Sequence, residues 1–441
     1  RAGRSTDAPD KRRDARHAAV VTGAGSRGRP SGVATAAWPQ LTLITGPPGS
    51  GKTHLARASV HPDRSMYVTL RDQYDGSELP ARLVRVIKAR VPALPGWLSA
   101  AVGPSCGPVS DHDPLRRAEQ LGSLIGQAQT THLHRPTTLV IDELERIDHD
   151  PTAMRLVESL VRATPELLSI VLVTRTGIPF PVNRLRGDER VLTIGEDDLA
   201  VGDDTARSIV RGRWPDLAEY VHELTAMCDR RPGAILAVAA LLASHDRSER
   251  AELLTEVAET ARDHDSDVST AAIRLICRQL DDDHRALVDD LAIVRRANLP
   301  ELERLGHEHA EKSITTLVAS GIVERAAGGS DIVRLGRDAS AVVAPRSAIA
   351  RQRAPAAVRA AVGRGDPINA GHIAATHGTG DLVRDTVVRF GTAAIDAGGG
   401  RLVLDAIDAL GDPSLGGIAG RAAQALGLWE RAIIEYERAA E

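Results

Sequence analysis

The segment that most constrains this chain runs from Gly46 to Thr53 and reads G-P-P-G-S-G-K-T. An apolar run, Leu41 to Thr45, precedes it, and an amphipathic run that starts at His54 follows it. A strand, the pattern G-x-x-x-x-G-K-[ST] and a helix, in that order, are the setting of a phosphate-binding P-loop. This order predicts an α/β fold built around a site for a nucleoside triphosphate.

The residue types in this segment suit the binding of phosphate groups. The glycines let backbone N–H groups turn toward an anion, Lys52 can reach the β- and γ-phosphates of ATP, and the Thr53 hydroxyl can ligate Mg²⁺. The alternative is a Gly/Pro-rich surface turn, but lysine occurs only at positions 11, 52, 88 and 312, so a chance match is rare. The predicted nucleotide-binding residues are Gly46, Pro47, Pro48, Gly49, Ser50, Gly51, Lys52, Thr53 and His54.

A second motif is an apolar run, Leu139 to Ile141, that ends in Asp142 and Glu143. Carboxylates at the carboxyl end of a parallel strand lie at the edge where α/β proteins bind their ligands. We therefore expect Asp142 to hold the Mg²⁺ shell and Glu143 to polarise the attacking water. Arg175 ends the next apolar run, where its guanidinium could read the γ-phosphate. The alternative for Arg175 is an exposed arginine at the end of a strand.

Residues 38–200 alternate short apolar runs with helical stretches, which is typical of a parallel sheet covered on both faces. The runs that we expect to form strands are 41–45, 65–70, 137–142, 169–175 and 190–195. The helices expected between them include 78–90 and 151–164. The Pro/Gly-rich stretch 91–113 is interpreted as a surface excursion. These features predict a P-loop NTPase domain.

The first 37 residues are rich in Arg, Gly, Ala, Ser and Asp and show no apolar periodicity, so we expect them to be disordered. Within them, residues 20–28 look like the dinucleotide-binding turn of short-chain dehydrogenases. The glycine spacing there is wrong, and Pro30 falls where the helix should run. An oxidoreductase is therefore not supported.

Two helical segments are expected after the sheet domain. In residues 201–265 we expect a helical lid, with Asp203 and Asp204 as its first N-cap region and Pro232 at the first position of a later helix. In residues 266–350 we expect three helices, 270–280, 282–293 and 309–320, with a shorter piece at 299–306. Two short strands, 321–325 and 332–335, follow and are joined by a Gly-containing turn at 327–331. This order predicts a winged-helix domain. Because no Lys/Arg cluster marks a recognition helix, a packing module is favoured over DNA binding.

Short Ala-rich helices fill residues 351–441. Near the end, a turn glycine is followed by aromatic and alanine residues at helical spacing, namely Gly427, Trp429, Ala432, Tyr436 and Ala439. This spacing is typical of a tetratricopeptide helix pair, which needs further repeats to bury its face. The alternative is an ordinary amphipathic helix.

Composition limits the remaining possibilities. The chain has 441 residues and a formal net charge of −4, so several domains fit and no basic excess points to nucleic acid. Cys106, Cys228 and Cys277 are isolated, which argues against a disulfide framework or a zinc site and fits a reducing cytoplasm.

No apolar run is long enough to cross a membrane, so we expect a cytoplasmic protein without a membrane partner. The chain starts with Arg and ends in a helical pattern, so we expect a piece of a longer protein.

Together these motifs resemble the STAND class of signalling ATPases, and within it the maltose-regulator type of LuxR-family transcriptional regulators. Gly46 to Thr53 looks like the Walker A motif, Leu139 to Glu143 like Walker B, and Arg175 like the sensor arginine. Cys228 to Leu236 looks like the segment whose G-x-P motif touches the nucleotide through its proline, here Pro232. The glycine of that motif is replaced by Arg230.

The resemblance implies a five-stranded P-loop core, a helical lid, a winged helix and tetratricopeptide-like repeats. It also implies a switch with slow ATP hydrolysis that rests with ADP in a closed form and becomes active with ATP, with Mg²⁺ as the metal cofactor. An unknown inducer would bind the helical repeats, and the ATP-bound form would self-associate. DNA would be bound only through a helix-turn-helix that is not in this chain.

Two other functions stay open from the residues alone. One is an AAA+-like ATPase whose turnover drives remodelling or loading of a partner. The other is a tetratricopeptide scaffold with a degenerate nucleotide site, against which intact Lys52, Thr53, Asp142 and Glu143 count. Fast turnover stimulated by nucleic acid would favour the AAA+-like enzyme, and tightly held ADP would favour the switch.

Overall fold

The computed structural model describes residues 39–70, 79–91, 114–132, 135–164, 166–178, 180, 191–325, 331–345 and 347–440. The predicted disordered segment 1–37 and nearly all of the predicted excursion 91–113 lie outside these residues, so both stay predictions. Cys106 lies outside them too, while Cys228 and Cys277 are free thiols.

The centre of the first part is a five-stranded parallel sheet in the order β2-β3-β4-β1-β5. The strands are β1 (Leu41–Thr45), β2 (Ser65–Thr69), β3 (Thr137–Asp142), β4 (Leu168–Thr174) and β5 (Val191–Ile194). Every strand predicted for this sheet is present, and each of these boundaries agrees to within one residue. Because β4 lies between β1 and β3, the strand that leads into the P-loop and the strand that ends in Asp142 flank a common neighbour.

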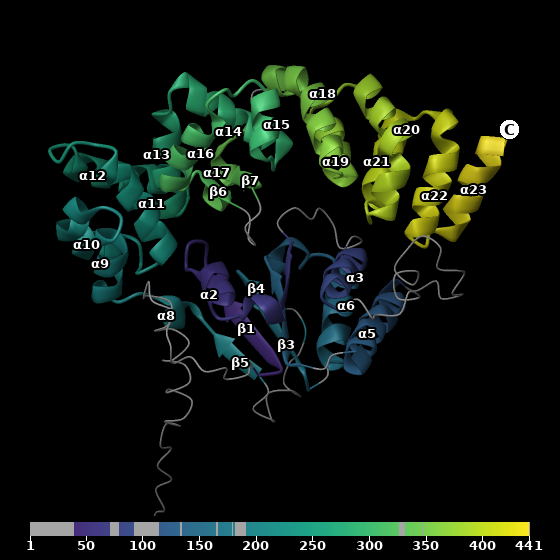
Figure 1. Ribbon diagram of the computed structural model, residues 1–441, viewed down its shortest axis with the longest axis horizontal. Helices are drawn as coiled ribbons and strands as arrows, with labels where there is room; N and C mark the ends of the chain where they lie inside the picture. The colour runs from purple at the N-terminus through teal and green to yellow at the C-terminus, as the bar shows by residue number, and fades with distance from the viewer. Residues whose placement is uncertain are drawn as a thin grey trace, which may run out of the picture.

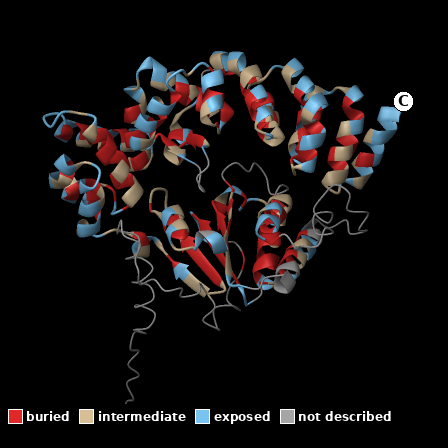
Figure 2. Cartoon of the chain, viewed as in Figure 1, coloured by how far each residue is buried: buried red, intermediate tan, exposed pale blue. Residues whose placement is uncertain are grey.

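Alternate side chains of the strands supply two separate apolar layers, as the pleat of a buried sheet requires. On one face Leu41, Leu43 and Ile170 pack with α3 (Leu79–Arg90), α5 (Pro114–His132) and α6 (Pro151–Arg162). On the other face Ile44 and Val171 pack with α2 (Lys52–Ala58) and α8 (Glu196–Leu199). Figure 2 shows the buried residues concentrated between these layers.

Helix α5 is absent from the helices expected from the sequence. Its two glycines lower helix propensity, but they also let it lie against α6. A Cβ atom on Gly122 would lie 2.5 Å from the carbonyl oxygen of Leu156, and one on Gly126 would lie 2.6 Å from Cβ of Ala163. Close packing therefore outweighs the intrinsic cost of glycine in this helix.

A helical lid follows the sheet. It contains α9 (Asp203–Arg211), η5 (Pro215–Tyr220), α10 (Val221–Met227), α11 (Pro232–Ala243) and α12 (Arg250–Asp263). The predicted cap of α9 was wrong, because Gly202 is the N-cap residue and Asp203 and Asp204 lie in the first turn. Helix α11 starts at Pro232, as predicted.

A winged helix comes next, formed by α13 (Val268–Arg278), α14 (Asp282–Val294), α15 (Leu299–Arg304), α16 (Ala310–Ala319), β6 (Val323–Arg325), β7 (Val333–Leu335) and α17 (Arg337–Val342). Strands β6 and β7 are antiparallel, as the predicted wing requires. Most of the predicted turn at 327–331 lies outside the described residues. Helix α17 was not expected from the sequence.

The rest of the described chain forms helical repeats, with α18 (Ser347–Gly363), α19 (Pro367–His377), α20 (Gly380–Asp396), α21 (Gly400–Leu410), η6 (Pro413–Leu415), α22 (Gly416–Ala425) and α23 (Trp429–Ala440). In the last pair, the ring of Tyr436 lies so close to Gly420 that a Cβ atom there would be 2.8 Å from it. This is the close packing expected of tetratricopeptide-like helices.

In Figure 1 the lid, winged helix and repeats form an arch over the sheet domain. One apolar cluster runs from Ala206 to Ala374 and so joins the lid, the winged helix and the first repeat helices. A second cluster, between Val387 and Ala432, lies in the later repeats. The domain boundaries predicted at 38–200, 201–265, 266–350 and 351–441 stay predictions.

Candidate functional site

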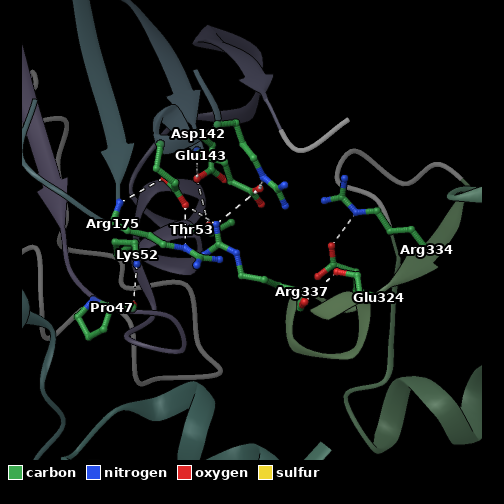
Figure 3. Close-up of polar contacts among 12 residues, drawn as sticks. Pro47, Lys52, Thr53, Asp142, Glu143, Arg175, Glu324, Arg334 and Arg337 are labelled. Carbon is green, nitrogen blue, oxygen red and sulfur yellow. Dashed lines mark hydrogen bonds and ion pairs between the residues drawn. The ribbon is translucent and has the colours of Figure 1, made fainter. Parts of the chain in front are cut away.

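The P-loop joins β1 to α2 and depends on three glycines with positive φ angles. These angles are 157° at Gly46, 74° at Gly49 and 88° at Gly51. Values of this kind favour glycine because a Cβ atom would collide with the backbone. The loop curls around the buried Lys52 ammonium, which donates a hydrogen bond to the carbonyl oxygen of Gly46 (2.5 Å). It donates another to the carbonyl oxygen of Pro47 (2.7 Å; Figure 3).

The environment of Lys52 lowers its pKa to about 8. Burial is the main cause, because it disfavours the charged form, and the nearby positive charge of Arg337 adds to it. Glu145 and Asp142 oppose the shift. Lys52 thus lies in a buried cluster of alternating charge, where an additional anion would stabilise its ammonium form.

Asp142 ends β3 beside the P-loop and makes three contacts through its two carboxylate oxygens. Oδ1 accepts hydrogen bonds from the Thr53 hydroxyl (3.2 Å) and from the backbone N–H of Glu143 (3.0 Å). Oδ2 accepts one from the hydroxyl of Tyr67 on β2 (2.5 Å). Burial and the charge of Asp142 raise the pKa of Tyr67, so its hydroxyl stays a donor.

The Thr53 hydroxyl and the Asp142 carboxylate are oxygen donors of the kind that Mg²⁺ prefers, and they lie within hydrogen-bond distance of each other. In the part of the chain that the structure describes, no group of three or more His, Cys, Asp or Glu side chains could hold a metal ion. A magnesium ion here would therefore need phosphate and water oxygens as its other ligands.

Glu143 follows Asp142 with a φ angle of 64°, which is rare for a residue with a Cβ atom. Its side chain is buried, and Oε2 has no hydrogen-bond partner. The nearest opposite charges are Arg337 Nη2 at 3.5 Å and Arg146 Nε at 3.6 Å. A strained, buried carboxylate with spare acceptor capacity is suited to bind a water molecule.

Arg175 follows β4 and contacts a residue that the sequence did not single out, Glu145 in the short helix η4 (Leu144–Arg146). Arg175 Nε lies 3.0 Å from Glu145 Oε1, and the backbone N–H of Arg175 donates to Oε2 (3.2 Å). The same Oε1 lies 2.7 Å from Nη2 of Arg337, the first residue of α17. The winged helix thus reaches the site through Arg337 (Figure 3).

The lid also reaches the P-loop, through the start of α11. The backbone N–H of Gly233 donates to the carbonyl oxygen of Gly49 (2.7 Å), and Arg231 Nη1 donates to that of Pro48 (3.4 Å). A Cβ atom on Gly51 would be 3.1 Å from Cγ of Pro232. Pro232 therefore packs against the loop, and its contact with the nucleotide stays a prediction.

Arg230 holds a left-handed conformation, with φ at 57°. Its backbone N–H donates to the Thr225 carbonyl and its own carbonyl accepts from Val201, so the turn is held at both ends. A glycine would adopt this conformation without strain, whereas Arg230 adopts it at a cost because its Cβ atom is crowded.

The structure thus brings together the loop residues Gly46 to Thr53 with Asp142, Glu143, Arg175 and Pro232. Ser50 is buried within the loop, whereas His54 is exposed on α2. Tyr67, Glu145, Gly233 and Arg337 complete the site. Of these, only Glu145 carried a sequence signal, because it lies three residues after Asp142 in the same acidic segment.

Comparison with known proteins agrees with these features. The sequence model described as AAA ATPase domain matches residues 32–173. The chain is 25% identical over 290 residues to the HTH-type transcriptional regulator MalT of Yersinia enterocolitica, across 64% of this chain and 30% of the relative. It is also 25% identical over 292 residues to MalT of Serratia proteamaculans, again across 64% and 30%. The chain spans about 30% of the length of these relatives.

A solved structure extends the likeness to the whole fold. It is the crystal structure of a Signal Transduction ATPase with Numerous Domains (STAND) protein with a tetratricopeptide repeat sensor from Pyrococcus horikoshii. The TM-score is 0.61 at 12% identity, covering 99% of this chain and 59% of that one. At this identity the likeness concerns the fold alone. Among the described residues, none of the helices is long and apolar enough to span a membrane.

Proposed function

We propose that this chain, a STAND-type ATPase similar to the MalT regulators, is the nucleotide-dependent switch of a cytoplasmic transcription regulator. It rests with bound ADP and becomes active with bound ATP. The observation that supports this best is that Gly233 of the lid and Arg337 of the winged helix both contact the P-loop site. A change of nucleotide at this site would therefore alter the contacts of both the lid and the winged helix.

Each site residue has a role in this proposal. Lys52 pairs with the β- and γ-phosphates, Thr53 and Asp142 hold Mg²⁺, Glu143 polarises the attacking water and Arg175 reads the γ-phosphate. Mg²⁺, when bound, neutralises phosphate charge. Pro232 packs against the nucleotide, and hydrolysis is slow and resets the switch.

The energy of the switch must come from more than one partner. Moving a protein from 1:99 to 99:1 takes about 5.5 kcal/mol of differential binding, which is more than one phosphate contact supplies. An inducer on the helical repeats and self-association of the ATP-bound form supply the rest. DNA is bound through a region outside this chain.

The test is to purify the chain without added nucleotide, denature it and identify what is released by chromatography. We expect stoichiometric ADP. Lys52→Ala should release none and should not bind ATP, because the loop loses its buried cation. If the wild-type site is empty and hydrolyses ATP rapidly, the protein is a remodelling or loading ATPase rather than a switch. If the site is empty and binds no nucleotide, the protein is a scaffold.

A further inference from the structure

We propose that Glu145 determines how strongly this chain prefers ADP to ATP. Its carboxylate holds Arg175 and Arg337 together, and the γ-phosphate of ATP has to compete with it for these two guanidinium groups. This inference rests on the proposed function, because it assigns a role within the same nucleotide site.

The geometry singles out one oxygen. Glu145 Oε1 lies 3.0 Å from Arg175 Nε and 2.7 Å from Arg337 Nη2, so one carboxylate oxygen accepts from two arginines. The side chain of Glu145 is 12% exposed and that of Arg337 is 20% exposed. The Glu145–Arg337 pair is shielded enough to interact more strongly than a surface ion pair, whereas Arg175 is 38% exposed and its pair is more screened by water. Glu145 therefore offsets at most one of the two positive charges that these arginines could offer to a ligand.

The other two carboxylates of the site do not do this. Asp142 is engaged by Thr53 and Tyr67, and Glu143 lies only within ion-pair distance of Arg337 and Arg146. Glu145 forms ion pairs with both Arg175 and Arg337, and Asp338, next to Arg337, also interacts with the charges of both arginines. Glu145 also contributes to the field at Lys52, which the two arginines oppose.

The charges predict which nucleotide binds more tightly when Glu145 is neutralised. ATP carries one more phosphate group than ADP, and Arg175 is the residue assigned to that group. Without the negative charge of Glu145, more positive charge would remain on Arg175 and Arg337 beside the γ-phosphate position, while Glu143 Oε2 stays 3.5 Å from Arg337 Nη2. Affinity for ATP should then rise more than affinity for ADP.

The experiment measures the dissociation constants of ADP and a non-hydrolysable ATP analogue, each with Mg²⁺, for nucleotide-free protein. Glu145→Gln keeps the shape of the side chain and removes its charge. We expect the ratio of the ADP constant to the ATP-analogue constant to rise at least about fivefold. Glu324→Gln is the matched control, since Glu324 pairs with Arg334 at 2.6 Å in the same winged helix (Figure 3) and should leave the ratio unchanged.

Arg337→Gln tests the pair from its other side and keeps the inference testable if Glu145→Gln does not fold. This variant removes a positive charge that is now paired with Glu145, so the ratio of the ADP constant to the ATP-analogue constant should fall. An unchanged ratio in both variants would overturn the role of Glu145 while leaving the nucleotide switch intact. Wild-type protein that binds neither nucleotide would instead remove the proposed function, and the inference with it.

Discussion

Asp142 owes its orientation to a tyrosine on the neighbouring strand. Tyr67 is paired with Val140 in the β2–β3 register, and its hydroxyl lies at the carboxyl end of the sheet, 2.5 Å from Asp142 Oδ2. Arg57 of α2 lies over the tyrosine ring, 5.2 Å from its centre. These contacts leave Asp142 Oδ1 directed at Thr53, the other predicted magnesium ligand.

Removing that hydroxyl should weaken the response to magnesium. In Tyr67→Phe, Asp142 Oδ2 loses its donor and the carboxylate can turn away from Thr53. We expect the Mg²⁺ concentration for half-maximal ATP binding to rise about tenfold, as for other residues that orient metal ligands. Nucleotide binding in excess chelator should not change. If both measurements match wild type, Tyr67 has no positioning role.

The left-handed arginine beside the lid predicts a gain in stability. A left-handed conformation costs a residue with a Cβ atom roughly 1–2 kcal/mol. A glycine avoids this cost, but it loses more conformational entropy on folding, which reduces the gain. Arg230→Gly should therefore raise the free energy of unfolding by about 0.5–1 kcal/mol, measured as a higher melting temperature. Arg230→Ala retains the Cβ atom and serves as control. Equal stabilisation by Ala would show that backbone strain at Arg230 is not the cause.

Among the elements, the strands were the easiest to predict and the helix packing the hardest. The strands of a buried parallel sheet are short apolar runs, such as 137–142, which stand out between helical stretches. Helix α5 was not predicted because Gly122 and Gly126 lower its propensity, and their benefit depends on α6. Arg337 could not be assigned to the site because its partner Glu145 is distant in sequence, and only the folded chain brings α17 to η4.

The contact between α11 and the P-loop predicts a strong effect from one methyl group. A Cβ atom on Gly233 would lie 2.8 Å from both Cα and the carbonyl oxygen of Gly49, so Gly233→Ala must push the helix away. We expect ATP and ADP affinities to fall about tenfold, because the lid no longer closes on the loop. Gly417→Ala in α22 is the control, as nothing lies within 4 Å of its added methyl. Unchanged affinity in Gly233→Ala would separate the lid from nucleotide binding.

Helix α19 makes the repeats sensitive to acid. Burial lowers the pKa of His372 from 6.5 to about 3, with a further contribution from Arg295. Between these values the unfolded chain binds the proton and the folded chain does not, so stability is lost as the pH falls below 6.5. By pH 5 this amounts to about 2 kcal/mol.

His372→Gln removes the titrating group, so its urea midpoint should fall less than that of wild type between pH 7 and pH 5. His222→Gln replaces an exposed histidine on α10 and should behave as wild type. A variant that loses as much stability as wild type would mean that protonation of His372 does not drive the loss.

On the scale of the whole molecule, the arch lies over the sheet domain (Figure 1), and polar contacts between described residues join the two. Those at the site come from Arg231, Gly233 and Arg337. Another, between Arg85 Nη2 of α3 and the carbonyl oxygen of Ala397 after α20 (3.0 Å), is exposed to solvent and so contributes little. Because the sheet and the arch have separate apolar cores, opening the arch would not disrupt either core.

A charge reversal at Arg337 should therefore open the arch without unfolding it. Arg337→Glu places a third carboxylate beside Glu143 and Glu145, and like charges brought together in this way cost several kcal/mol. Small-angle X-ray scattering should give a larger radius of gyration, with an unchanged helix signal in circular dichroism. Arg325→Glu makes the same charge change at an exposed position of β6 and should keep the wild-type radius. If Arg337→Glu also keeps the wild-type radius of gyration, the lid contact at Gly233 is enough to hold the arch closed, and the Arg337 contact is not needed for closure.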